Sequence, residues 1–212
     1  MTFTTIDLNP LFSTPFVRAS LDNAASIDLN RQLTEIILKK AHESRGVFIS
    51  NSQGWQSDDR LIEWGGQPVQ IILDALRELV NQITMCVAGE QYRRVALDWR
   101  INGWANINRE GNSNVPHVHP GAYWSVVYYV STNAVNGKGG ELELFDPRGA
   151  VPVMYRPWLC IGMQDYASAG TSRFHTPKAG QCVIFPSWVK HAVRPFVGEG
   201  IRISLAFNFA IH

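Results

Sequence analysis

The stretch HAVRPFVGEGIRISLAFNF, residues 191–209, decides the fold, because its second half alternates strictly between two kinds of side chain. One set is small or polar, and it comprises Arg202, Ser204, Ala206 and Asn208. The other set is large and apolar, and it comprises Ile201, Ile203, Leu205, Phe207 and Phe209. A period of two is typical of a β-strand with two different faces. We interpret the small and polar face as the lining of a cavity and the apolar face as a surface that packs beneath helices.

Three histidines lie around this strand in a pattern that suits a metal ion. His117 and His119 end another β-like segment, and residues two apart project to the same side of an extended chain. His191 follows the apolar segment CVIFPSW and can supply a third ligand. Further along, Arg202 and Ser204 share a face, and a guanidinium fork beside a hydroxyl can clamp a carboxylate. The sequence therefore predicts a metal site next to a carboxylate-binding site.

Strand-like segments dominate the chain after residue 95, and helical spacing dominates before it. The strand-like segments are VALDWRINGWANIN, WSVVYYVS, GELELFD, QCVIFP and IRISLAFNF, separated by Gly, Pro and Asn. One helix is predicted after Ser26, and a second from Val69 to Val87, where Gly89 can end it. We predict an α+β protein of one domain, residues 1–212. Its helical part is 1–94, and its core, 95–212, is an antiparallel jelly roll covered by helices on one side.

Composition excludes several broad classes. At 212 residues with 45% apolar side chains, the chain can bury one substantial core. A formal net charge of +1 argues against bulk attraction to nucleic acid or anionic membranes. The segment MTFTTIDLNPLFSTPF lacks the features of a signal peptide, and no apolar run is long enough to span a bilayer, so we expect a cytoplasmic protein. The cysteines, Cys86, Cys160 and Cys182, have no CxxC spacing, which argues against a disulfide framework or a zinc ribbon.

The order of these motifs resembles that of the 2-oxoglutarate- and Fe(II)-dependent oxygenases. Their double-stranded β-helix, a cupin-like jelly roll, carries His-x-Asp/Glu, a distal His, and then an Arg or Lys. Here the matching residues are His117-Val118-His119, His191 and Arg202. SVVYYV, GGELELF and HAVRPFVGEGIRISLAF are similar to segments of the prolyl-hydroxylase branch. The pattern HxHP, YYV, DPR and FPSW is closer still to a group of bacterial and phage oxygenases, and the resemblance covers roughly Trp99 to Phe209.

The resemblance implies a cofactor, a co-substrate and a reaction. Fe(II) would be held by His117, His119 and His191, which would form the catalytic centre. The co-substrate 2-oxoglutarate would be chelated there. Together with molecular oxygen it would hydroxylate a C–H bond, with release of succinate and CO2. The substrate, small or peptidyl, is not specified by any motif, and neither is the oligomeric state.

The same resemblance assigns the rest of the co-substrate site. Arg202 and Ser204 would hold the distal carboxylate of 2-oxoglutarate. Tyr129, on the same parity as Ser125, would face the co-substrate, and Asn106 would approach it from the other side. Three tryptophans near motif ends could form walls of the pocket, and these are Trp104, Trp124 and Trp188. The long segment 149–177 could cover it and contribute to substrate choice.

One position departs from the family pattern, because His119 stands where the acidic ligand is usual. A neutral imidazole can complete the ligand set, but the site then has one negative charge fewer. A carboxylate from GELELFDP remains an alternative ligand. Glu141 and Glu143 alternate with leucines that the resemblance turns inward, so Asp146, where the segment ends, is the better candidate of the three.

Two other functions stay open. A three-histidine dioxygenase of the cupin kind would need no oxo-acid, and Arg202 would then bind the carboxylate of the substrate itself. A non-catalytic jelly-roll module would use the histidine pair to bind a structural or adventitious zinc ion, although such a site needs no carboxylate clamp. The remaining histidines, His42, His175 and His212, are interpreted as structural or surface residues.

Overall fold

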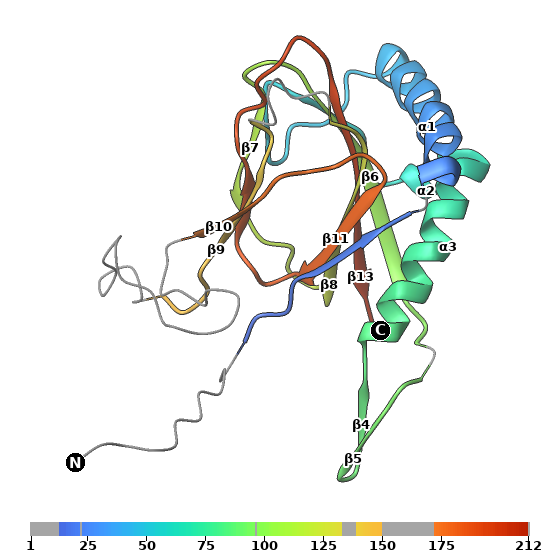
Figure 1. The fold of residues 1–212 in the computed structure, drawn as a ribbon, viewed down its shortest axis with the longest axis vertical. Coiled ribbons are helices and arrows are strands. Elements are labelled where there is room, and N and C mark those ends of the chain that lie inside the picture. The colour runs from blue at the N-terminus through green and yellow to red at the C-terminus, as the bar shows by residue number, and fades with distance from the viewer. Residues whose placement is uncertain (1–12, 22, 96, 133–138, 150–171, 212) are drawn as a thin grey trace.

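Two antiparallel sheets face each other in the computed structural model, which describes residues 13–21, 23–95, 97–132, 139–149 and 172–211 (Figure 1). The larger sheet has the order β1 (Val17–Ser20), β11 (Gln181–Pro186), β8 (Trp124–Thr132), β13 (Arg202–Ala210), β6 (Arg100–Asn108), β3 (Trp55–Gln56). The smaller has the order β10 (Ser172–His175), β9 (Leu142–Phe145), β12 (His191–Val193), β7 (Ser113–His117), β2 (Asn51–Ser52). This arrangement confirms the predicted jelly roll with helices on one side.

The helices cover the outer face of the larger sheet: α1 (Asn23–Glu43), α2 (Leu61–Trp64) and α3 (Gly66–Ile83) (Figure 1). From α1 and α3, Leu33, Ile37 and Val80 enter the main core and are fully buried. Removing such side chains from water is the main stabilising contribution to this layer, at about 1.5–3 kcal/mol each. Within the described residues, none of the helices has the length and apolar character needed to cross a lipid bilayer.

β13 shows the alternation predicted from the sequence. Ile203, Leu205, Phe207 and Phe209 are completely buried in the core beneath the helices. The opposite face, with Arg202, Ser204, Ala206 and Asn208, lines the cavity between the two sheets. β13 lies between β6 and β8 and pairs with β6 along its whole length, from Arg202↔Asn108 to Ala210↔Arg100. The ladder with β6 is uninterrupted, and the ladder with β8 shifts register once, between Ile203 and Ser204. Pairing on both sides therefore fixes which side chains reach the cavity.

A second, smaller core lies between the sheets. Tyr129, Val183 and Phe185 contribute to it from the larger sheet, and Leu142 and Leu144 from β9. The leucines of GELELFD thus turn inward, as the family resemblance implied. This apolar cluster lies beside the cavity, and Tyr129, Leu142 and Phe185 belong to both.

The predicted end of the second helix is wrong. The helix ends at Ile83, because Thr84 is extended and its hydroxyl donates a hydrogen bond to the carbonyl oxygen of Val80 at 2.6 Å. The next residues form a hairpin of β4 (Cys86–Ala88) and β5 (Gln91–Arg93). Val87 is therefore a strand residue, and Gly89, with φ of 64°, belongs to the hairpin turn.

The N-terminal part also contributes strands that the periodicity did not predict. β1 pairs with β11 at one edge of the larger sheet, and β3 pairs with β6 at the other. β2 extends the smaller sheet by pairing with β7. These strands have two to four residues each, which is too short for a period to be recognised in the sequence.

Candidate metal centre and pocket

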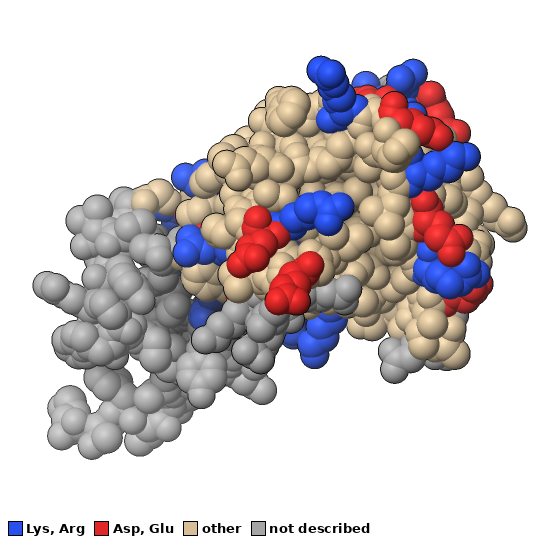
Figure 2. Space-filling model, turned by 90° about the horizontal axis from the view of Figure 1, so that it is seen from above, with Lys and Arg blue, Asp and Glu red and all other residues tan. Residues whose placement is uncertain are grey.

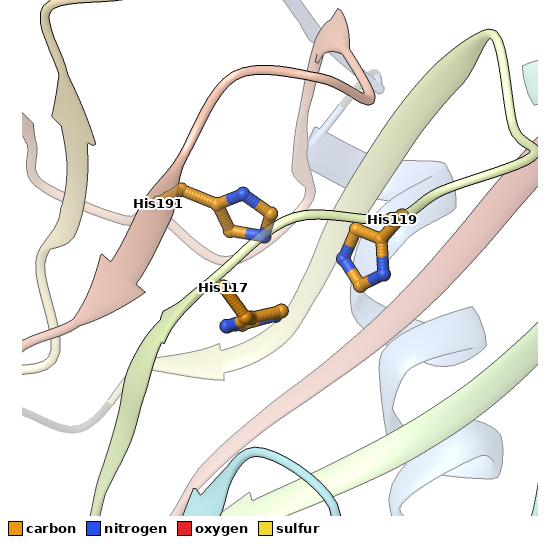
Figure 3. A group of neighbouring side chains, drawn as sticks. All are labelled: His117, His119 and His191. Carbon is orange, nitrogen blue, oxygen red and sulfur yellow. The ribbon is translucent and has the colours of Figure 1, made fainter.

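Three histidine side chains converge in the wall of the cavity, and Figure 3 shows their rings pointing toward one another. His117 ends β7 and His191 begins β12, and these two residues are direct partners in the antiparallel ladder. His119 follows two residues after His117, so it projects to the same side. One ligand nitrogen from each of the three lies within 4.8 Å of the others. The structure therefore brings together the three histidines that the sequence singled out.

Backbone carbonyls orient two of these rings. Nδ1 of His117 lies 2.7 Å from the carbonyl oxygen of Val115, and Nδ1 of His191 lies 2.9 Å from that of Val189. A carbonyl oxygen can only accept, so each Nδ1 carries the proton. Nε2 of each ring then holds a free lone pair. This second contact, which fixes tautomer and ring orientation, is the usual companion of histidine ligands.

Burial keeps the three imidazoles neutral. Burial lowers the pKa of His117, and it lowers the pKa of His119 to about 4 and that of His191 to about 3. Repulsion from a protonated His117 lowers the last two pKa values further. A metal ion needs the neutral form, so protons compete little at neutral pH. Neutral nitrogen donors in this number and orientation fit a divalent iron ion.

The acidic residues of GELELFDP have other partners. Asp146 accepts from Nε of Arg148 at 2.9 Å, and the guanidinium lowers the pKa of its carboxyl group. Glu141 accepts from the backbone N–H of Gly139 at 2.9 Å, and Glu143 from the hydroxyl of Ser172 at 2.8 Å. Within the described part of the chain, the histidine cluster contains no carboxylate. His119, and not Asp146, lies with the other two histidines.

Arg202 lies in the same pocket as the histidines and is only 2% exposed. Its Nη1 donates to Oδ1 of Asn108 at 3.1 Å and to Oγ of Ser204 at 3.2 Å. Its guanidinium carbon lies 5.3 Å from the centre of the Tyr129 ring, and its Nε has no hydrogen-bond partner among the residues that the structure describes. No salt bridge to Arg202 occurs within the described residues. A buried cation without a counter-charge is costly, so this end of the pocket suits an anion.

Two further side chains complete the polar wall. Asn106 lines the pocket, and its buried Oδ1 atom has no hydrogen-bond partner in the described part of the chain. Tyr129 is fully buried, and this burial raises the pKa of its hydroxyl to about 12 despite the nearby Arg202. At neutral pH it is therefore a neutral donor. Both residues were singled out in the sequence, and both face the same cavity as Arg202.

Asn108, which accepts a hydrogen bond from Arg202, was not predicted from the sequence. It lies two residues after Asn106 on β6, so strand parity could have identified it. Among the tryptophans, Trp104 lines the pocket, and its ring centre lies 5.4 Å from that of His119. The expectation for Trp124 is wrong. It packs in the core under the helices, where its indole N–H bonds to Thr84. Trp188 is 57% exposed, and most of segment 149–177 lies outside the described residues.

A family model described as "Putative 2OG-Fe(II) oxygenase" matches residues 102–208, half of the chain. The chain belongs to this family. The match spans the strands that carry the histidines and Arg202. As a 2OG-Fe(II) oxygenase, the protein is an enzyme that uses Fe(II), 2-oxoglutarate and molecular oxygen.

Solved structures of other oxygenases have the same fold. A prolyl-4-hydroxylase from Pseudomonas putida is 18% identical, with a TM-score of 0.61 over 95% of each chain. A prolyl hydroxylase from Trichoplax adhaerens, in complex with a hypoxia-inducible-factor peptide, is 13% identical, with a TM-score of 0.59 over 92% of this chain and 83% of that one.

HygX from Streptomyces hygroscopicus, with nickel and 2-oxoglutarate bound, is 13% identical, with a TM-score of 0.56 over 93% of this oxygenase and 83% of HygX. No curated protein sequence matches the chain. At these identities the solved structures support the fold, whereas the family match supports the chemistry.

Proposed function

We propose that His117, His119 and His191 hold the Fe(II) of this oxygenase, and that Arg202 with Ser204 holds the distal carboxylate of 2-oxoglutarate. The observation that carries this proposal is that one pocket contains both three converging neutral imidazoles and a buried arginine without a carboxylate partner in the described chain. A dicarboxylic oxo-acid fits such a pocket. One of its carboxylates would meet the cation, and its oxo-acid end would face the histidines.

Each pocket residue then has a separate task. The carbonyls of Val115 and Val189 hold two imidazoles with their Nε2 lone pairs free. Asn108 and Ser204 hold the guanidinium, and its unpaired Nε remains available for a carboxylate oxygen. Asn106 and the neutral hydroxyl of Tyr129 add polar contacts along the co-substrate. When bound, Fe(II) with 2-oxoglutarate and oxygen supplies the oxidising power for C–H hydroxylation, with release of succinate and CO2.

We propose that the substrate presents an apolar group to the mouth of the pocket. Two exposed apolar residues adjoin pocket residues in the sequence: Ile49 precedes Ser50, and Val118 lies between His117 and His119. Exposed apolar side chains clustered at a pocket are a common feature of binding surfaces. The peptide bound to the Trichoplax adhaerens neighbour supports a peptidyl substrate as one possibility, beside a small molecule.

We do not expect this protein to bind nucleic acid. On the face shown in Figure 2, basic and acidic side chains are interspersed, and neither sign forms a large patch. The net charge of +1 agrees with this distribution. The cytoplasmic location stays a prediction from the sequence.

The decisive experiment is anaerobic reconstitution of the protein with Fe(II) and 2-oxoglutarate. Bidentate chelation should produce a weak visible charge-transfer band, and admission of oxygen should convert 2-oxoglutarate into succinate. Succinate formation also separates this function from a three-histidine dioxygenase that uses no oxo-acid. Absence of both the band and succinate from protein that retains stoichiometric iron would contradict the co-substrate site.

Metal ligation is tested separately by His117→Ala and His191→Ala. Each variant should lose stoichiometric iron uptake and keep the fold, because apolar strands hold the barrel and the histidines lie in the wall of the cavity. Iron content by elemental analysis and far-UV circular dichroism measure the two outcomes. Full iron occupancy in either folded variant would show that the ligand set is misassigned.

A further inference from the structure

The β4–β5 hairpin stands away from both sheets, below the end of α3 (Figure 1). Its strands pair only with each other among the described strands. The register Ala88↔Gln91 leaves Gly89 and Glu90 as a two-residue loop, and Gly89 has the positive φ that such loops require. A two-stranded hairpin is marginally stable in water by itself. Further pairing would therefore stabilise this one.

The hairpin also exposes apolar side chains that are usually covered. Val87 and Tyr92 are opposite each other in the register, so they lie on one face, and each is 70% exposed. Met85 and Val95, at the base, are 49% and 42% exposed. A cross-strand pair of a β-branched and an aromatic residue is a typical stabilising unit of a larger sheet. Here it faces solvent in the isolated chain.

The outer edge of β5 offers free backbone groups. In a hairpin with a two-residue loop, the residues next to the loop exchange hydrogen bonds, and these are Ala88 and Gln91. The following pair, Val87 and Tyr92, then directs its N–H and C=O groups outward. Tyr92 thus presents one donor and one acceptor at an edge that no described strand covers.

Opposite charges lie at equal distances on the two sides of Tyr92 in the sequence. Glu90 lies two residues before Tyr92, and Arg94 lies two residues after it. All three side chains are exposed, and neither charged residue forms a salt bridge within the described part of the chain. In an antiparallel pair centred on Tyr92, residues equally distant from the centre face each other. A second copy of the same strand would therefore place opposite charges opposite each other.

We propose that two copies of this protein associate through β5, which pairs antiparallel with itself about Tyr92. Tyr92 would exchange two backbone hydrogen bonds with Tyr92 of the partner subunit, and Glu90 would face Arg94 of the partner subunit on both sides of the axis. The two hairpins would form one four-stranded sheet with a shared apolar face of Val87 and Tyr92. Such a two-fold contact closes on itself, so it yields a dimer and no filament.

Antiparallel pairing of β4 with a second copy of itself would not bring opposite charges together. Pairing about Val87 would place Met85 opposite Gly89, without any charge pair. The contact through β5 is small compared with the roughly 1,200 Å² buried in stable interfaces, so the dimer is weak and concentration-dependent. Ion pairs at its rim make it weaker at high salt.

Sedimentation velocity over a range of protein concentrations tests the proposal. Wild-type protein should shift from monomer to dimer as concentration rises. Glu90→Arg and Arg94→Glu should each weaken association by about tenfold or more, because each places two like-charge pairs across the axis. An equimolar mixture of the two variants should dimerise again, since both facing pairs then have opposite charges. The double variant should also dimerise by itself.

Glu110→Arg is the matched control, because it makes the same change of charge at an exposed position outside the hairpin. The hairpin precedes β6 in the sequence, whereas Glu110 follows it. It should associate like wild type. Circular dichroism and thermal melting of every variant establish that the fold is kept. A wild-type protein that stays monomeric at all concentrations overturns the proposal. So does a dimer that Glu90→Arg leaves unchanged, or a mixture of the two single variants that stays monomeric.

Discussion

At the scale of single residues, the pocket has an unusual charge balance. Arg202 is the only side chain of its described lining with a permanent charge, and burial keeps the three histidines neutral. Because His119 stands where a carboxylate is usual in related sites, no side chain of the cluster neutralises a divalent ion. Under the proposed ligand set, 2-oxoglutarate supplies that negative charge. Metal and co-substrate should therefore strengthen each other's binding.

The replacement Arg202→Lys tests the carboxylate clamp. Lysine keeps the positive charge but loses the planar fork, so it cannot reproduce the contacts to Asn108 and Ser204 while it also binds a carboxylate. We expect 2-oxoglutarate to bind more weakly by about 1.5–3 kcal/mol, the size of one charged hydrogen bond. Isothermal titration with the Fe(II)-loaded protein under anaerobic conditions measures this change. The exposed Arg194→Lys is the control, and equal affinity of all three proteins would exclude Arg202 from the co-substrate site.

Two replacements of His119 test its assignment as the third ligand. His119→Asp restores a carboxylate at the same backbone position, and its added charge should strengthen the attraction for a divalent ion. His119→Ala opens a further coordination position and should weaken iron retention. We expect iron affinity of the Asp variant to equal or exceed that of wild type, and the Ala variant to lie well below both. Competition with a metal chelator measures the order, and an Ala variant as tight as wild type would remove His119 from the ligand set.

At the scale of elements, strand parity was the most reliable guide. The alternation in β13 correctly predicted which side chains face the cavity, because a nine-residue strand in mid-sheet leaves little freedom of register. Helical spacing was less reliable. Val87 continues the apolar period of α3, yet it lies in β4, because Thr84 ends the helix through contacts distant in sequence. Trp124, which is 40 residues away, bonds to Thr84, and no local pattern predicts such a contact.

Thr84→Val, at the junction of α3 and β4, should lower the free energy of unfolding. The Thr84 hydroxyl donates to the carbonyl of Val80 and accepts from the indole N–H of Trp124 at 2.9 Å, and all of this is buried. Valine keeps the shape and leaves the indole donor unpaired, at a cost of about 1–3 kcal/mol. Urea denaturation measures the change. Thr34→Val is the matched control and should cost less, because the Thr34 hydroxyl bonds only to the carbonyl of Asn30 among the described residues. Equal losses would mean that the Trp124 contact contributes little.

At the scale of the whole molecule, the two faces of the larger sheet have different tasks. Its outer face packs beneath the helices and carries the main apolar core, while its inner face carries the polar side chains of the pocket. The sequence predicted this division of the sheet into two different faces. It did not predict β1, β2 and β3 or the isolated hairpin, because these short pieces take their conformation from their pairing partners. Asn108 lies on the same strand face as Asn106, so parity alone could have predicted it, but its contact with Arg202 joins residues 94 positions apart.

The buried charge in the pocket should make the empty protein less stable than it could be. Arg202→Met replaces the guanidinium with an apolar chain of similar length, which removes the cost of burying an unpaired cation. Asn108 and Ser204 lose their hydrogen bonds to the guanidinium, and this loss offsets part of the gain in stability. Water in the pocket can replace these hydrogen bonds. Without ligands we expect the free energy of unfolding of the Met variant to equal that of wild type or to exceed it by up to about 4 kcal/mol. Arg202→Lys keeps the buried charge, so it should not become more stable than wild type.

Thermal unfolding of the same proteins with Fe(II) and 2-oxoglutarate completes the comparison. Ligands that bind only the folded state raise the melting temperature, so wild type should gain from 2-oxoglutarate and the Met variant should not. The two effects together would mean that this fold gives up stability at Arg202 in order to bind a dicarboxylate. A Met variant that is clearly less stable than wild type without ligands would contradict this, because it would mean that the polar contacts of Arg202 within the fold already offset its burial.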